Sequence, residues 1–273
     1  MPSPTEITVP QLARLVGTPD APVLVDLRTP EDFAADPQLI PGAVRHDATA
    51  LDALVSRLAG QRVVVYCQRG RKISQGGAAI LRAEGVACEV LEGGQLAWRD
   101  AGRPIVEASA MPARDAAGRT TWVTRHRPKV DRIACPWLVR RFVDPDARFL
   151  FVPPEDVALV AERFGAVPFD AEGLGLTHEG ERCSFDAFVA AFGIEDTALD
   201  RVAAIVRAAD TNRHDLAPEA AGLLAVSLGL SRMHRDDVAQ LDAGMVVYDA
   251  LYRWARDAAD EGHDWPSAVT RPS

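Results

Sequence analysis

The residues best suited to chemistry lie in one continuous stretch around Cys67. Three valines, Val63–Val65, predict a buried parallel strand that ends just before this cysteine. The following loop contains Gly70 and several basic residues, and Ser74 is predicted to cap the next helix. Backbone N–H groups and the positive end of a helix stabilise a thiolate and favour a bound anion in the same place. The stretch therefore predicts a nucleophilic sulfur that attacks a partner carrying negative oxygens.

Short strands and helices alternate through the first hundred residues and would position this cysteine. Val23–Val25 and Glu89–Leu91 predict two further strands, and apolar residues at helical spacing lie between them. This alternation predicts an α/β fold with a parallel sheet flanked by helices. The site of such a sheet lies beyond the carboxyl ends of its strands, where Asp26, Arg28 and Cys67 all fall. Asp26 and Arg28 are candidate catalytic residues, or alternatively an ion pair that orients the loops.

The first half of the chain resembles the rhodanese-like (sulfurtransferase) domain family. The matching segments are Val25–Phe33, Ile40–Ala43, Tyr66–Lys72 and Glu92–Gly94, with Trp98 and Gly102–Pro104. The resemblance implies that Cys67 takes sulfane sulfur from thiosulfate or another donor, forms a persulfide and passes the sulfur to a thiol or to cyanide. It also implies an anion-binding loop that consists of Gln68, Arg69, Gly70, Arg71 and Lys72.

Two other interpretations of Cys67 are open. It could be a structural cysteine, because free cysteine packs as a small apolar residue, but a basic, glycine-containing loop is an unusual place for one. Phosphatases of related architecture also use a loop cysteine, and they need an arginine at the end of the loop to hold phosphoryl oxygens. This chain has Lys72 there, where many rhodanese relatives carry arginine. Lysine supplies charge without a planar fork, and sulfur transfer is the preferred interpretation.

Composition limits the function classes and the number of domains. The 273 residues carry a net charge of −9, which argues against general binding to nucleic acid. No apolar run reaches the roughly 18–20 residues that a membrane span needs, the start of the sequence has no secretory pattern, and the four cysteines lack a C-x-x-C pair. We therefore expect a cytoplasmic protein with free thiols. Small residues, prolines and glycine predict a linker at 108–120, between domains at 1–107 and 121–265.

The second domain is predicted to be a mainly helical α+β structure that opens with a strongly basic segment. The segment from Arg125 to Arg141 contains six basic residues and a single acid, Asp131. The segment predicts either a pocket for a small oxyanion or a basic face that is solvated or forms ion pairs between the domains. The candidate anion-binding residues are Arg125, Arg127, Lys129 and Arg132.

Several acids and one histidine of this domain are candidate metal ligands. A capping box at Thr197–Asp200 predicts a helix whose apolar face also carries Asp210. A carboxylate on an apolar face needs a cation or several donors. Together with His178, Asp131 and Glu179 it would offer nitrogen and oxygen ligands to a divalent metal. The spacing fits no standard metal motif, so a hydrogen-bonded histidine and an arginine-paired aspartate are the alternative.

The second domain resembles the chromate-resistance protein family. The matching segments are Trp122–Asp144, Thr177–Gly180 with Cys183, and Ala208–Asp210. The resemblance implies a role in chromate tolerance or sensing and no particular reaction. Chromate, sulfate and thiosulfate are related anions, which suggests a sulfurtransferase coupled to an oxyanion-responsive domain. The alternatives are a non-catalytic sensor of oxyanion or metal that uses the first domain as a thiol reporter or docking module, and direct reduction of chromate by Cys67.

Overall fold

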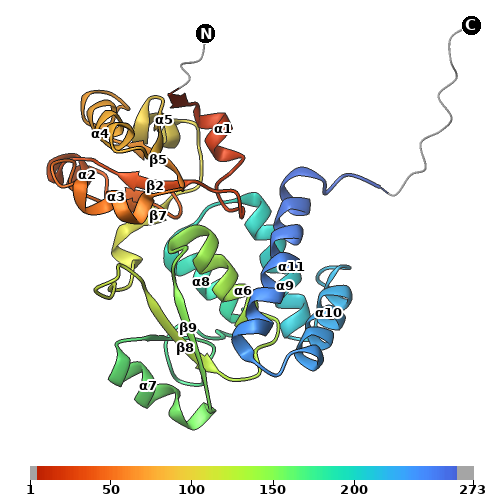
Figure 1. Ribbon diagram of the computed structural model, residues 1–273. Coiled ribbons are helices and arrows are strands. Elements are labelled where there is room, and N and C mark those ends of the chain that lie inside the picture. The colour runs from red at the N-terminus through yellow and green to blue at the C-terminus, as the bar shows by residue number, and fades with distance from the viewer. Residues whose placement is uncertain (1–4, 263–273) are drawn as a thin grey trace, which may run out of the picture.

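Five short strands of the first domain pair in parallel in the order β1-β6-β5-β2-β4. Figure 1 shows two of them, β2 and β5, among the helices of this domain. Residues 5–262 are described in this computed structural model. The strands are β1 (Glu6–Ile7), β2 (Val23–Asp26), β4 (Val44–Arg45), β5 (Arg62–Tyr66) and β6 (Ala87–Leu91). The helices are α1 (Val9–Ala13), α2 (Pro30–Ala35), α3 (Asp52–Leu58), α4 (Lys72–Ala83) and α5 (Gly94–Asp100). A separate antiparallel pair joins β3 (Gln38–Leu39) to β7 (Val106–Glu107).

Alternating side chains of the central strands fill two apolar layers. Leu24 and Val64 belong to the layer that α1 and α5 cover. Val25 and Val65, the next residues along the same strands, belong to the layer under α3 and α4. Both faces of the sheet are therefore covered, as a parallel sheet requires. The predicted α/β fold with flanking helices is confirmed.

The second domain contains a three-stranded parallel sheet and is rich in helices. The strand order is β10-β8-β9. The strands are β8 (Thr121–Arg125), β9 (Arg148–Val152) and β10 (Val167–Pro168). The helices are α6 (Asp131–Leu138), α7 (Val157–Phe164), α8 (Ser184–Phe192), α9 (Thr197–Asp210), α10 (Ala220–Met233) and α11 (Asp237–Asp257). The predicted mainly helical α+β architecture is confirmed.

Two predicted helix caps were wrong. The helix after Cys67 begins at Lys72, so Ser74 lies within its first turn instead of preceding it. Helix α9 is capped by Asp196, whose side chain accepts hydrogen bonds from the N–H groups of the second and third helical residues. The capping box predicted at Thr197–Asp200 is displaced by one residue, because Asp196 is as good an N-cap as threonine.

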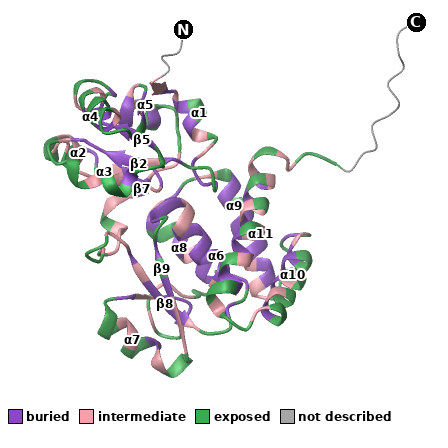
Figure 2. Cartoon of the chain, viewed as in Figure 1, coloured by how far each residue is buried: buried purple, intermediate pink, exposed green. Residues whose placement is uncertain are grey.

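A buried aromatic cluster at the centre of the second domain positions two acids. Trp122, Trp137 and Phe188 are fully buried, and they belong to the core that α6, α8, α9 and α11 share (Figure 2). Packing in this core places the N-terminus of α6 near the C-terminus of α9. These two ends carry Asp131 and Asp210.

The two domains contact each other directly. The N–H of Gly42 donates to the carbonyl oxygen of Phe142 at 2.7 Å, and Arg57 forms an ion pair with Asp146 at 2.6 Å. A Cβ at Gly17 would collide with the ring of Phe142. The predicted limits at 107 and 121 stay predictions, and the limit at 265 lies outside the described residues. Within residues 5–262, every helix is too short or too polar to cross a membrane.

Candidate functional site

Cys67 lies directly after β5, and its sulfur faces the first turn of α4. Its Sγ lies 3.2 Å from the hydroxyl oxygen of Ser74, and the backbone N–H groups of Arg69, Arg71 and Ser74 also hydrogen-bond to it. The residue is 5% exposed. Burial by itself raises the pKa of the thiol, but the hydrogen bonds from Ser74 and from the backbone outweigh it, so the pKa of Cys67 lies below its ordinary value.

The loop keeps this shape because two glycines let backbone segments approach closely. Gly70 has φ +62°, and a Cβ there would meet the carbonyl oxygen of Leu91. Gly94 has φ +61°, and a Cβ there would overlap the carbonyl oxygen of Cys67. The same oxygen accepts a hydrogen bond from the N–H of Gln95 at 3.0 Å. Backbone contacts with the start of α5 therefore hold the loop in place.

Four of the five predicted anion-binding residues of the loop, Arg69 to Lys72, line an open hollow. Arg69, Arg71 and Lys72 line this hollow of about 510 Å³ together with the acids Glu6 and Glu92. The two carboxylates reduce the positive potential that the basic side chains create. We therefore expect the backbone N–H groups around Cys67 to contribute more to anion binding than the basic side chains do. Gln68 directly follows Cys67 in the sequence, and Gly70, with its positive φ, allows the loop to turn.

Asp26 and Arg28 form a buried ion pair. Nη2 of Arg28 lies 2.7 Å from Oδ2 of Asp26, and both side chains are fully buried. The guanidinium also donates to the carbonyl oxygens of Asp36 at 2.8 Å and Gln38 at 2.5 Å. Arginine thus holds the chain between β2 and β3 in place. Of the two roles considered for these residues, the geometry favours the ion pair that orients loops.

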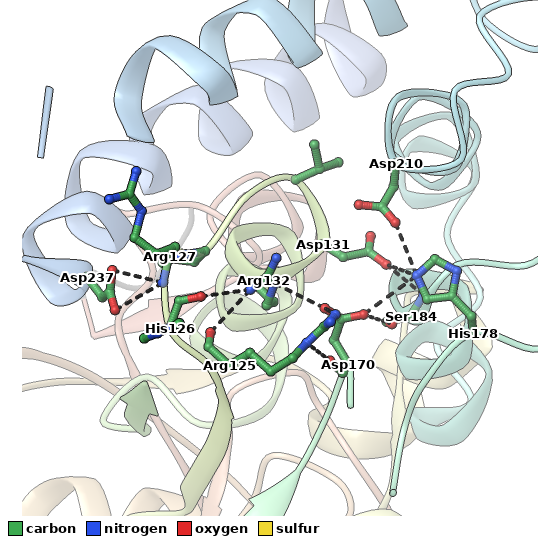
Figure 3. A network of polar contacts seen from close by, with 12 residues as sticks. Arg125, His126, Arg127, Asp131, Arg132, Asp170, His178, Ser184, Asp210 and Asp237 are labelled. Carbon is green, nitrogen blue, oxygen red and sulfur yellow. Dashed lines mark hydrogen bonds and ion pairs between the residues drawn. The ribbon is translucent and has the colours of Figure 1, made fainter. Parts of the chain in front are cut away.

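A second polar centre lies in the second domain, where three carboxylates surround one imidazole nitrogen (Figure 3). Nε2 of His178 lies 3.1 Å from Oδ2 of Asp210, 3.5 Å from Oδ2 of Asp131 and 3.6 Å from Oδ1 of Asp170. Asp131 begins α6, Asp210 ends α9, and Asp170 follows β10. His178 comes from the long segment between β10 and α8.

Burial and mutual repulsion disfavour ionised carboxylates in this centre. Asp131 is 1% exposed, and its burial together with the charges of Asp210 and Asp170 raises its pKa well above the ordinary value. Burial and the charge of Asp170 also raise the pKa of Asp210. Oδ2 of Asp131 accepts a hydrogen bond from the N–H of Ser184 at 2.7 Å. Its Oδ1 has no hydrogen-bond partner within residues 5–262.

Three of the four predicted metal ligands meet here, and the fourth does not. Asp131, His178 and Asp210 are in contact through the imidazole nitrogen. Glu179 is exposed and pairs through its backbone with Arg182, away from the group. Sequence reasoning missed Asp170, a buried acid with φ +46° in an irregular segment that shows no apolar periodicity.

The basic segment is largely occupied by ion pairs and hydrogen bonds with acids. Oδ2 of Asp170 forms ion pairs with Nη2 of Arg125 at 3.0 Å and with Nε of Arg132 at 3.1 Å. The backbone N–H of Arg127 donates to both carboxylate oxygens of Asp237, while Lys129 is exposed. These acids belong to the second domain, so the pairs do not join the two domains, and an oxyanion pocket in this segment stays a prediction.

Comparison with known protein families assigns both halves of the chain. Residues 8–101 match the family described as rhodanese-like domain. Residues 122–255 match the family described as ChrB, C-terminal domain. The chain therefore combines a rhodanese-like domain with a ChrB C-terminal domain, as both resemblances implied.

Two individual proteins are similar to parts of this chain. Protein ChrB of Cupriavidus metallidurans is 36% identical over 196 residues, which cover 67% of this chain and 59% of that protein. An uncharacterized protein of Synechocystis is 32% identical over 118 residues, which cover 40% of this chain and 60% of that protein. The chain thus spans about three fifths of the length of these relatives.

Two solved structures are similar to part of this chain. A rhodanese-related protein of Thermoplasma volcanium is 22% identical, covers 37% of this chain and 96% of its own, and has a TM-score of 0.32. A thiosulfate sulfurtransferase of Pseudomonas aeruginosa is 27% identical, covers 38% of this chain and 19% of its own, and also has a TM-score of 0.32.

Proposed function

We propose that the first domain is a sulfurtransferase that uses a persulfide on Cys67. The observation that carries this proposal is a nearly buried thiol whose pKa is nonetheless lowered by Ser74 and by backbone N–H groups. A thiolate is the nucleophilic form of cysteine. The same N–H groups suit the anionic end of a donor such as thiosulfate.

The reaction proceeds in two displacement steps at sulfur. The Cys67 thiolate attacks the outer sulfur of thiosulfate, the S–S bond of the donor breaks, and sulfite leaves with the bonding electron pair. An acceptor thiolate or cyanide then attacks the terminal sulfur of the persulfide. The S–S bond at Cys67 breaks, and the thiolate is restored.

The second domain relates the chain to chromate-resistance proteins, and we propose that it makes sulfur transfer responsive to an oxyanion. Chromate and sulfate are tetrahedral dianions, and thiosulfate has sulfur in place of one sulfate oxygen. The direct contacts between the domains, including the hydrogen bond from Gly42 to Phe142, provide a physical route for coupling. A change in the sulfur-transfer rate on adding chromate or sulfate tests this part of the proposal.

Mass spectrometry after thiosulfate treatment tests the persulfide. We expect Cys67 to gain one sulfur atom, and we expect turnover of thiosulfate with cyanide to fall at least about 1000-fold in Cys67→Ser, because the nucleophile is lost. Cys88→Ser is the matched control, since Cys88 is equally buried and its pKa is raised to about 11. A folded protein without added sulfur on Cys67 would contradict the proposal.

The second candidate function is a non-catalytic sensor in which Cys67 reports on oxidants or anions. The 5% exposure of Cys67 favours it, because a donor must reach the sulfur through the loop. Turnover distinguishes the two candidates. Equal rates for the wild type and Cys67→Ser, with a Cys67 that still reacts once with an oxidant, would favour the sensor.

A further inference from the structure

We propose that Asp131, Asp170, His178 and Asp210 bind one divalent ion of a first-row transition metal. This site lies in the second domain and is independent of the sulfur chemistry proposed for Cys67. Figure 3 shows the four side chains converging from α6, α9 and the segment between β10 and α8.

Three of the four residues place ligand atoms close enough for one ion, and Asp210 contacts the imidazole of this group. One ligand atom each from Asp131, Asp170 and His178 lie within 4.8 Å of one another. Nε2 of His178 is 3.1–3.6 Å from an oxygen of each aspartate. Ligands about 2.1 Å from a metal are separated by roughly 3–3.5 Å, so an ion would fit among these atoms with small side-chain movements.

The environment of Asp131 is a second observation in favour of a cation site. Asp131 is 1% exposed, and its Oδ1 lacks a hydrogen-bond partner in the described chain. Figure 3 shows its carboxylate between Asp210 and His178. A buried carboxylate oxygen without a donor is costly, and the single N–H of one imidazole nitrogen cannot serve three carboxylates at once. A divalent cation would satisfy all of them together.

Neighbouring cations hold Asp170 in place without neutralising the whole centre. Arg125 and Arg132 both contact its Oδ2, while its Oδ1 faces His178 and accepts a hydrogen bond from the hydroxyl of Ser184 at 2.9 Å. Hydrogen-bonded partners of this kind orient metal ligands. Within residues 5–262, His178 is the only ion-pair partner of Asp131 and of Asp210.

The donor types define the class of metal. Three carboxylates and one imidazole suit Mn²⁺, Fe²⁺ or Zn²⁺, whereas Mg²⁺ and Ca²⁺ prefer oxygen ligands alone.

Titration of Mn²⁺ into the chelator-treated full chain, with free Mn²⁺ followed by electron paramagnetic resonance, tests the site. We expect one saturable ion per chain that Zn²⁺ displaces and an equal concentration of Mg²⁺ does not. His178→Gln and Asp210→Asn should each weaken binding at least about tenfold. Glu179→Gln, which alters the exposed acid next to His178, should leave binding unchanged.

Asp131→Asn keeps the test decisive even if other variants lose stability. Asparagine retains the size of the side chain and an oxygen acceptor for Ser184, and it removes one negative charge from the centre. We expect the metal-free variant to melt above the metal-free wild type and to lose the increase in melting temperature that Mn²⁺ gives the wild type. Absence of saturable Mn²⁺ binding by the folded wild type, or an unchanged Mn²⁺ shift in this variant, would overturn the proposal.

Discussion

The Cys67 loop lowers the pKa of its thiol, whereas the centre around Asp131 and His178 raises the pKa of the carboxyl groups of Asp131 and Asp210. In the loop, a hydroxyl and several backbone N–H groups surround a thiol and lower its pKa. In the centre, burial and two further carboxylates raise the pKa of Asp131. The first site stabilises a negative charge on sulfur, whereas the second disfavours negative charge on its carboxylates.

Burial alone does not explain this difference. Cys67 and Cys88 are each 5% exposed; Cys67 directly follows β5, and Cys88 lies within the neighbouring strand β6 of the same sheet. Burial raises the pKa of Cys88 to about 11, whereas the pKa of Cys67 is lowered. The hydrogen-bond donors that a loop directs at the sulfur therefore decide the sign of the shift.

The largest effect is expected from Gly94→Ala, which would break the backbone-built site. An added Cβ would overlap the carbonyl oxygen of Cys67, and φ is +61° at this position. We expect about 4 kcal/mol of lost stability, from left-handed strain and overpacking together. Urea unfolding measures it.

Gly85→Ala is the control for the collision. Gly85 has φ +81°, and an added Cβ would meet nothing within 4 Å, so only the strain of about 1–2 kcal/mol applies. Equal losses for the two variants would show that close packing of the loop against α5 does not matter.

The next effect concerns the centre built from side chains. Arg132→Gln removes one of the two cations at Asp170 and leaves this buried carboxylate beside Asp131 and Asp210. We expect the free energy of unfolding, measured by heat or urea, to fall by about 3 kcal/mol, because breaking a buried ion pair leaves a buried charge without its partner. Arg253→Gln breaks an exposed pair with Asp257 and should change stability by less than about 1 kcal/mol. Equally small losses in Arg132→Gln and Arg253→Gln would mean that mutual repulsion of the three acids does not measurably destabilise the fold.

The sequence predicted the first site better than the second because the first is continuous in the chain. β5, the loop and α4 follow one another, so residue types alone placed Cys67 near N–H donors. Ser74 was assigned to the wrong helical position, yet it still reaches the sulfur. A loop built from successive residues needs little knowledge of tertiary packing.

The second site required tertiary structure. Asp210 was found because a carboxylate on an apolar helix face needs a partner. Asp170 lies in an irregular segment, where neither periodicity nor spacing marks a residue as buried. Glu179 was included as the neighbour of His178, but adjacent residues of an extended segment point to opposite sides. Which acids converge depends on how α6, α9 and β10 pack.

A smaller effect separates the hydroxyl from the backbone donors at Cys67. Ser74→Ala removes the side-chain hydrogen bond and keeps the N–H groups. A hydrogen bond to a charged group contributes about 1.5–3 kcal/mol, so the thiolate population near neutral pH should fall roughly tenfold or more. Thiolate absorbance and the rate of alkylation by iodoacetamide measure this change. An unchanged rate would assign the lowered pKa to the backbone alone.

The smallest effect is a pair of opposite pH slopes, obtained by comparing the wild type with Cys67→Ala and with Cys88→Ala. Because the pKa of Cys67 is lowered on folding, its thiolate stabilises the fold above the pKa of the unfolded thiol, and this contribution is lost as the pH falls through the folded value. The stability advantage of the wild type over Cys67→Ala should therefore grow as the pH rises between these two values.

Cys88 should show the reverse, because its thiol stays protonated in the fold up to about pH 11 while the unfolded thiol ionises near pH 8.5. The wild type should lose stability relative to Cys88→Ala as the pH rises through that interval, by at most about 1.4 kcal/mol per pH unit. Urea unfolding over a pH series measures both slopes, and all other titrating groups cancel in each difference. Slopes of the same sign would show that the two equally buried cysteines share one environment, and the contrast between donor-rich loop and apolar strand would fail.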